Sequence, residues 1–334
     1  LGSHKNSNFG SSIKEIVEDK LKIDFIINIP TKNTKESAVK LISKSSEKIS
    51  KYYEKNKPDA IFVTGDRYEI LSAVYPAIIY NIPIYHLHGG EVSLGSFDNS
   101  IRNSISMMSD FHFVATSKSK ERLKKMGINK SNIFHVGSPS IDPIFFPKII
   151  DKKSLYKKNK IEFNKKNILV TYHLETIDTK KNKKNIKILL SALKLLKNTN
   201  IFFTGINADP ESFYIRKQIL NYINKKDNCF YFSNLGKSVY FSMIYHTDMT
   251  IGNSSSGIIE VPCFKKPTIN IGHRQGGREQ SNSIINADLN VKDITSKIKY
   301  GYSKAFQKKL KKIDNPYLKR NSNDKIVKVI KRHI

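Results

Sequence analysis

The amino-acid sequence predicts an α/β protein made of two doubly wound, Rossmann-like domains. Short runs of β-branched and aromatic residues alternate with amphipathic stretches along most of the chain, which is the pattern of repeated βαβ units. The same pattern restarts after a polar, Lys-rich stretch at residues 151–166. The chain has 334 residues, of which 39% are hydrophobic, and this is enough to fill two cores.

The first domain is expected over residues 1–158. Strand-length apolar runs occupy residues 60–64, 82–87, 111–115 and 133–136. Between them, apolar residues at three- and four-residue spacing predict helices at residues 69–80, 99–108 and 119–126. Pro76 falls inside the first of these helices and predicts a kink there.

The second domain is expected over residues 159–318, with the boundary inside the polar stretch. Its strands are predicted at residues 168–172, 201–204, 229–232, 249–252 and 267–271, and its helices at 185–196, 211–224, 238–246 and 256–261. An amphipathic helix at about residues 324–333 belongs to the remaining segment, 319–334, and is expected to pack back on the first domain. Both sheets should be parallel and covered on both faces.

Lysine dominates a strongly basic composition. The formal net charge is +29, from 58 Lys and Arg against 29 Asp and Glu, but Arg supplies only eight of the basic residues. Bidentate recognition of phosphates and base edges favours Arg, so we expect a solvated Lys surface and no nucleic-acid partner. No apolar run reaches membrane-spanning length, and no membrane association is expected. Cys229 and Cys263 show no zinc-ligand spacing, which favours a reduced, cytoplasmic setting and no metal.

The predicted fold also indicates the kind of ligand. Doubly wound domains bind ligands at the carboxyl ends of their strands, so two such domains are expected to enclose a cleft. Helices that follow those strands point free N–H groups into it, which favours a phosphate-bearing ligand. The sequence contains neither GxGxxG nor GxxxxGK[ST], so the dinucleotide and P-loop classes lack their signatures.

Two segments of the first domain carry acid–base groups where predicted strands end. Residues 64–69 (TGDRYE) follow the first strand, and residues 86–91 (HLHGGE) follow the second, with Asp98 and Arg102 shortly after. The candidate catalytic residues are Asp66, His88, Glu91 and Asp98, because they share one predicted sheet edge and can move protons near neutral pH. Capping of the following helices is an alternative for Asp66 and Asp98.

Two segments of the second domain suit a diphosphate. Residues 251–260 (IGNSSSGIIE) pass through a Gly/Ser turn into a helix, so Ser254 and Ser255 can donate beside free backbone N–H groups. Glu260 is placed to accept from ribose hydroxyls. Residues 270–278 (NIGHRQGGR) carry two arginines, and with Arg67 and Arg102 half of the arginines in the chain lie in or shortly after these four segments. This clustering indicates a cleft for an anion.

Together these segments resemble the UDP-N-acetylglucosamine 2-epimerases, specifically the hydrolysing branch that makes free N-acetylmannosamine for sialic acid synthesis. Matching residues extend along nearly the whole chain, from Gly-Ser-His near its start through residues 97–102 (FDNSIR), 173–176 (HLET) and 207–209 (NAD). The resemblance implies a glycosyltransferase B type fold with the active site in the interdomain cleft. The residues expected to bind the UDP-sugar are His4, Arg67, Arg102, His173, Asn207, Ser254, Ser255, Glu260, Arg274 and Arg278.

The chain departs from the family pattern in two places. Many relatives read His-x-Glu-Gly-Gly where this chain has His88 at the Glu position and Glu91 three residues on, so either residue is a candidate for that proton. Relatives also begin with a strand and a Gly-x-Arg-Ala-Glu type turn before the Gly-x-His segment, at which this chain starts. We therefore expect a first domain without its first strand and helix, in a fragment of a longer gene product.

The resemblance implies that UDP-N-acetylglucosamine and water become N-acetylmannosamine and UDP. The C2 proton is not next to a carbonyl, so the family eliminates UDP to give 2-acetamidoglucal and then adds water with inversion at C2. This chemistry requires a charge sink, a base and an acid, and no cofactor is expected. A homodimer or homotetramer is expected.

Three alternatives stay open at this point. The first is the same chemistry on a UDP- or GDP-2,4-diacetamido-trideoxyhexose of the legionaminic acid pathway. The second is a non-hydrolysing epimerase or a glycosyltransferase on the same fold. The third is a catalytically inactive, truncated binding module.

Overall fold

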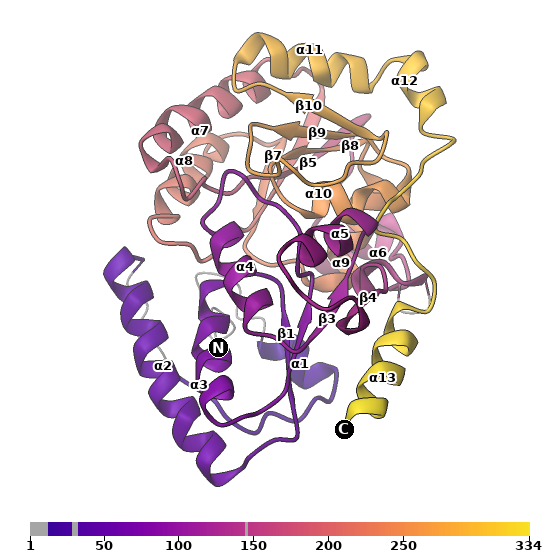
Figure 1. Ribbon diagram of the computed structural model, residues 1–334. Coiled ribbons are helices and arrows are strands. Elements are labelled where there is room, and N and C mark those ends of the chain that lie inside the picture. The colour runs from indigo at the N-terminus through magenta and orange to yellow at the C-terminus, as the bar shows by residue number, and fades with distance from the viewer. Residues whose placement is uncertain (1–12, 29–32, 144–145) are drawn as a thin grey trace.

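Two parallel sheets with helices against their faces make up the chain, as the computed structural model shows (Figure 1). The structure describes residues 13–28, 33–143 and 146–334. The predicted α/β class with two Rossmann-like units is confirmed. No helix within these described ranges is long and apolar enough to cross a bilayer.

The first sheet has four parallel strands in the order β1-β2-β3-β4. Its strands are β1 (Ile61–Thr64), β2 (Ile84–Leu87), β3 (Phe111–Val114) and β4 (Ile133–His135). Its helices are α2 (Lys35–Lys55), α3 (Leu71–Ile79), α4 (Asp98–Met107) and α5 (Ser117–Lys125), and the short α1 (Ile13–Glu18) precedes them. Pro76 lies inside α3, and the kink expected there stays a prediction.

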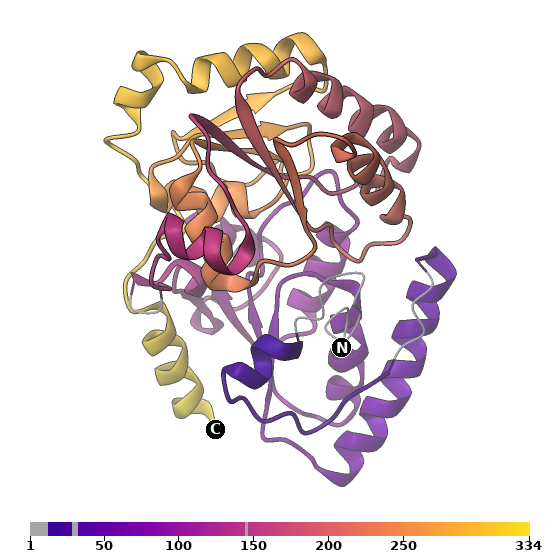
Figure 2. The same cartoon turned by 180° about the vertical axis from the view of Figure 1, so that it is seen from behind.

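Helices cover both faces of this sheet. On one face, Ile49 and Tyr53 of α2 and Val74 of α3 pack with Val63 and Ile84 of the strands. The other face is aromatic, and the C-terminal helix α13 (Ser322–His333) lies against it (Figures 1 and 2). The last segment of the chain therefore returns to the first domain.

The second sheet has six parallel strands in the order β10-β9-β8-β5-β6-β7. Its strands are β5 (Lys166–Thr171), β6 (Thr199–Thr204), β7 (Cys229–Phe232), β8 (Met249–Gly252), β9 (Thr268–Ile271) and β10 (Ile284–Ala287). Its helices are α6 (Lys152–Asn159), α7 (Thr179–Lys194), α8 (Phe213–Ile223), α9 (Gly236–His246), α10 (Ser256–Ile259), α11 (Val291–Gly301) and α12 (Lys304–Lys309). The strand order reverses between β5 and β8, which is the ligand-binding point of a doubly wound sheet.

The core of the second domain explains its nearly continuous apolar strands. Ile168 and Val170 of β5 pack against α7, α8 and α11, while Leu169 between them packs with Met243 and Ile244 of α9 on the opposite face. All three strand residues are buried, because successive side chains of a doubly covered strand point into two cores.

An apolar cluster also joins the two domains. Ile258 and Ile259 of α10 pack with Ala115 after β3, with Ile141, and with Tyr317 on the segment that returns to the first domain. Because side chains from both domains are buried in this cluster, it holds the two domains together.

The structure adds elements that were not predicted. No element was assigned to the polar stretch at residues 151–166, but α6 forms there, capped by Asp151, with Leu155 as its buried anchor. The 21-residue α2, the edge strand β10 and the helices α11 and α12 were also not predicted. Strand β10 is short and lies at the edge of the sheet, so its sequence pattern is weak.

Candidate active site between the two domains

Two neighbouring strands bring the first acid–base groups together. Strands β1 and β2 are parallel, and Thr64 lies opposite Leu87 at their carboxyl ends. Asp66 lies two residues after Thr64 and His88 lies one residue after Leu87, so the two share one sheet edge, as predicted. His88 has a positive φ of 67°, so the chain turns sharply at the imidazole.

Asp66 is held by an almost fully buried arginine. The Arg102 guanidinium is 1% exposed and donates to the Asp66 carboxylate, to the Glu91 carbonyl at 2.9 Å and to Ser93 Oγ at 3.0 Å. Arg102 of α4 thus ties the loop after β1 to the loop after β2. Asp66 does not cap a helix, since no side chain caps the short helix that follows it.

His88 and Glu91 form a hydrogen-bonded pair. His88 Nδ1 lies 2.7 Å from Glu91 Oε1, and Arg278 of the second domain donates to the other Glu91 oxygen. The Arg278 charge and His88 together lower the pKa of Glu91 to about 2, although burial works in the opposite direction. Glu91 is therefore ionised at neutral pH, and the Nδ1 proton of His88 points at it.

Asp98 has the opposite electrostatic environment. Burial and the nearby Asp209 carboxylate raise its pKa, while Ser96 and the Arg274 guanidinium, 3.7 Å from Asp98 Oδ2, lower it less. Among the described residues, Asp98 Oδ1 has no hydrogen-bond partner although it is buried. The capping alternative is wrong for this residue, because Phe97 occupies the N-cap of α4 and no side chain caps it.

A further carboxylate enters from the second domain. Asp209 follows β6 and accepts from Arg67, whose guanidinium also donates to Glu69 at 2.9 and 3.2 Å. Asp209 Oδ2 is buried and unpartnered within the described parts of the chain. Asp209 was not among the residues predicted for the site, although the segment 207–209 that matches the family contains it.

The second domain contributes a neutral histidine. His173 is buried, and burial and the Arg274 charge lower its pKa to about 3. Its Nδ1 accepts from the Asn207 backbone N–H at 3.2 Å, so the imidazole proton is on Nε2 and can be donated to a ligand. The buried amide of Asn253 fixes the loop by bonding the His173 backbone at 2.7 and 2.8 Å.

The turn after β8 brings Ser254 and Ser255 to this cluster. Gly252 permits the turn, because a Cβ there would stand 1.8 Å from the Thr171 carbonyl oxygen. Arg274 donates to the Asn253 carbonyl at 3.2 Å and leaves its buried Nε without a partner among the described residues. Unpartnered buried donors and acceptors on both sides of the cleft are what a bound polar ligand would satisfy.

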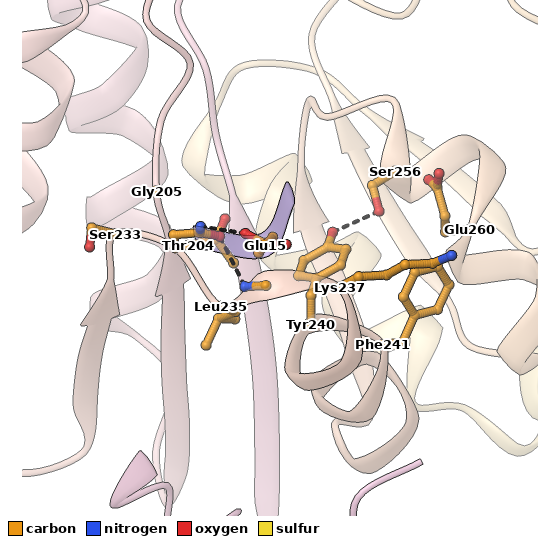
Figure 3. A pocket seen from close by; sticks show the side chains of 12 residues that line it. Glu15, Thr204, Gly205, Ser233, Leu235, Lys237, Tyr240, Phe241, Ser256 and Glu260 are labelled. Atoms are coloured by element: carbon orange, nitrogen blue, oxygen red, sulfur yellow. Dashed lines mark hydrogen bonds between the residues drawn. The ribbon is translucent and has the colours of Figure 1, made fainter. Parts of the chain in front are cut away.

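A cavity of about 360 Å³ opens beside this cluster (Figure 3). It is bounded by the ends of β6 and β7, by α9 and by α10, and Glu15 of α1 reaches it from the other side. Tyr240 donates to Ser256 Oγ at 2.7 Å within it, and Ser140 of the first domain donates to Glu260 at 2.9 Å. Burial raises the pKa of Glu260. The volume lies within the range of small-molecule pockets, roughly 300–1,000 Å³.

Three arginine–carboxylate pairs span the two domains: Arg67 with Asp209, Arg274 with Asp98, and Arg278 with Glu91. Their loops are in close contact, since a Cβ at Gly95 would lie 2.7 Å from Arg274 Cα. The predicted site residues from both domains therefore converge. His4 lies outside the described residues. The Arg102 guanidinium donates to Asp66 and to Glu91 and Ser93 in the loop after β2.

Several residues at the site were missed from the sequence. Besides Asp209, these are Asn253, Tyr240 and Glu15. Asn253 lies inside a segment that was selected for its glycine and serines. Tyr240 and Glu15 lie within helices and carried no signal that separates them from other helix residues.

The two doubly wound domains, the buried acid–base groups between them and the adjoining cavity define a protein that handles a nucleotide-linked ligand. The model of the UDP-N-acetylglucosamine 2-epimerase family matches residues 1–331, and the chain belongs to this family.

Its relatives include two informative proteins. The chain is 40% identical over 294 residues to the GDP/UDP-N,N'-diacetylbacillosamine 2-epimerase (hydrolyzing) of Campylobacter jejuni subsp. jejuni serotype O:2, covering 87% of this chain and 76% of that protein. It is 33% identical to polysialic acid biosynthesis protein P7 of Escherichia coli, over 100% of this chain and 85% of that protein.

The fold agrees with a solved structure. The UDP-GlcNAc 2-epimerase from Neisseria meningitidis, bound to UDP-GlcNAc, superimposes with a TM-score of 0.78 over 98% of this chain and 90% of that chain, at 20% identity.

Proposed function

We propose that this protein is a hydrolysing nucleotide-sugar 2-epimerase. It converts a nucleoside-diphosphate 2-acetamido sugar and water into the free 2-epimer and the nucleoside diphosphate. Membership of the 2-epimerase family and the hydrolysing relative at 40% identity support this reaction type.

The observation that carries the proposal is the contrast between two acid–base groups in one cleft. Glu91 stays ionised and orients His88, whereas the pKa of Asp98 is raised. Environments that separate protonation states in this way distinguish a general base from a general acid.

We assign the steps as follows. His88 Nε2 takes the C2 proton, the C1–O bond breaks with its electron pair leaving on the diphosphate, and a C1=C2 double bond forms. Arg274 and the turn at Ser254 and Ser255 stabilise the departing anion. Asp98 then donates a proton to the opposite face of C2, and water adds at C1 and loses a proton to solvent.

The nucleotide is proposed to lie in the second domain. Glu260 accepts from the ribose hydroxyls, the neutral His173 donates from Nε2, and the nucleoside occupies the cavity beside Tyr240. Arg67 approaches from the first domain, where it already balances the buried carboxylate of Asp209.

Two sugars are candidate substrates. The Campylobacter relative acts, by its name, on N,N'-diacetylbacillosamine linked to GDP or UDP, and this supports a 2,4-diacetamido-trideoxyhexose as the substrate. UDP-N-acetylglucosamine is the second candidate, supported by the family model and by the relative named for polysialic acid biosynthesis.

The test is incubation of the full chain with each nucleotide sugar, following nucleoside diphosphate release and identifying the sugar by NMR. The proposal predicts release with a free sugar inverted at C2, faster for the diacetamido sugar. A nucleotide-linked epimer would instead indicate a non-hydrolysing epimerase, and a glycoside would indicate a glycosyltransferase. No release from either sugar would refute the activity.

A further inference from the structure

A carboxylate and an amide meet at the end of the cavity away from Glu260. Glu15 of α1, labelled in Figure 3, and Asn234 of the loop between β7 and α9 both line it, and Asn234 Nδ2 donates to Glu15 Oε1 at 2.8 Å. The two residues are 219 positions apart, so the contact joins the N-terminal segment to the second domain.

The orientation of the Asn234 amide is fixed. Its Oδ1 accepts from the Gly236 backbone N–H at 2.9 Å, so Nδ2 is the side that faces Glu15. Nδ2 carries two hydrogens, of which Glu15 takes one. Glu15 Oε2 lies against the same loop, 3.6 Å from where a Cβ of Gly236 would stand. The pair thus presents one N–H donor beside one carboxylate acceptor.

We propose that Glu15 and Asn234 read the nucleobase and select bases with a keto group next to a ring N–H. This inference rests on the proposed function, which places the ribose at Glu260 and so directs the base to this end of the cavity. Asn234 donates to the keto oxygen and Glu15 accepts from the ring N–H.

The hydrogen-bond pattern of each base decides whether it can pair with Glu15 and Asn234. Uracil offers O4 beside N3–H, and guanine offers O6 beside N1–H, so both match the pair. Cytosine and adenine present an amino group beside an unprotonated ring nitrogen. The Asn234 donor would then face another donor, and the Glu15 carboxylate would face another acceptor. Guanine also offers a 2-amino donor next to N1–H, which suits the second carboxylate oxygen of Glu15. A site built to pair with one polar pattern discriminates well, because the wrong base leaves its groups unpaired.

Glu15 also helps to orient the Asn234 side chain. Without the carboxylate, nothing on α1 would bond the Asn234 amide, and the bond from the Gly236 backbone N–H alone would hold its orientation. Glu15 is therefore both a contact to the base and a positioning residue for Asn234.

The test is calorimetric titration of the full chain with UDP, GDP, CDP and ADP. Unmodified protein should bind UDP and GDP at least about tenfold more tightly than CDP and ADP, since two hydrogen bonds are exchanged for two unpaired groups. Glu15→Ala should lower the ratio of UDP to CDP affinity at least about threefold, because one of the two base contacts is lost. Glu18→Ala, on an exposed position of the same helix, should keep the ratio of the unmodified protein.

Each outcome bears on one claim. Equal binding of UDP and CDP by the unmodified protein, or an unchanged ratio in Glu15→Ala, would overturn the base-reading role even if sugar turnover is normal. Absence of binding by all four nucleotides would instead count against the proposed function. The measurement on the unmodified protein does not depend on the folding of any variant.

Discussion

At the scale of single residues, the site depends on how each carboxylate is paired. Asp66 faces a buried arginine, Glu91 faces an arginine and an imidazole, and Asp98 keeps one oxygen unpartnered among the described residues. Asp98 is therefore the carboxylate best placed to hold and release a proton, and Asp66 is first of all the partner of Arg102.

Asp98→Asn tests this distinction. The variant should fold and bind the nucleoside diphosphate, but its kcat should fall at least about a hundredfold, the usual scale for a general acid. Because the pKa of Asp98 is raised, the unmodified protein should lose activity as pH rises through that pKa, and the residual activity of the variant should lack this alkaline limb. Steady-state kinetics over pH give both results.

Asp59→Asn, at an exposed position before β1, is the matched control and should leave kcat unchanged. Full activity of Asp98→Asn, or an alkaline limb that persists in it, would remove Asp98 from the mechanism.

Some partners of single residues could not be predicted from the sequence. The sequence left His88 and Glu91 as alternative candidates for one proton, and their roles depend on Arg278, which lies 187 positions from Glu91. No local pattern specifies such a partner. The same holds for Asp209, which was recognised within a matching segment but became a site residue only through Arg67 of the other domain.

At the scale of elements, the strands were the most predictable part. The expected bounds of β7 and β8 match the structure, because short buried β-branched and aromatic runs have few alternatives. Helix α6 was not predicted because it is rich in Lys and buries only Leu155. Helix α1 has no buried residue, and its place beside the cavity follows from tertiary contacts alone.

The strands also make the fold sensitive to acid. His86 in β2, His112 in β3 and His173 after β5 are buried, and burial lowers the pKa of His86 and His112 to about 4 and that of His173 to about 3. The unfolded chain binds these protons below about pH 6.5, so the folded state loses stability as pH falls from there toward 4.

Urea unfolding at pH 7.5 and 5.5 checks this. The unfolding free energy should fall by roughly 3–4 kcal/mol at the lower pH, since each such group contributes about 1.4 kcal/mol per pH unit. His112→Gln should reduce the dependence by about one proton. An unfolding free energy that is equal or higher at pH 5.5 would contradict the neutral, buried state of these imidazoles.

At the scale of the whole molecule, the cleft is assembled from groups that neither domain can complete alone. The first domain supplies Asp66, His88, Glu91 and Asp98, the second supplies most of the cavity lining with Arg274 and Arg278, and three ion pairs with one apolar cluster hold the two domains together. The sequence predicted two domains and placed the candidate acid–base groups at one edge of the first sheet. Both predictions follow from the local periodicity of apolar residues. It did not predict the pairing across the cleft, which depends on how the domains pack.

The central claim is that this cleft eliminates the nucleoside diphosphate and then hydrates the double bond. The most direct measurement is the reaction in D2O with the nucleotide-linked 2,4-diacetamido-trideoxyhexose and with UDP-N-acetylglucosamine, followed by NMR of the released sugar. We expect a free sugar with inverted configuration and one deuterium at C2, because the proton added there comes from a group that exchanges with solvent. A released sugar that keeps its configuration, or that carries the original hydrogen at C2, would contradict it.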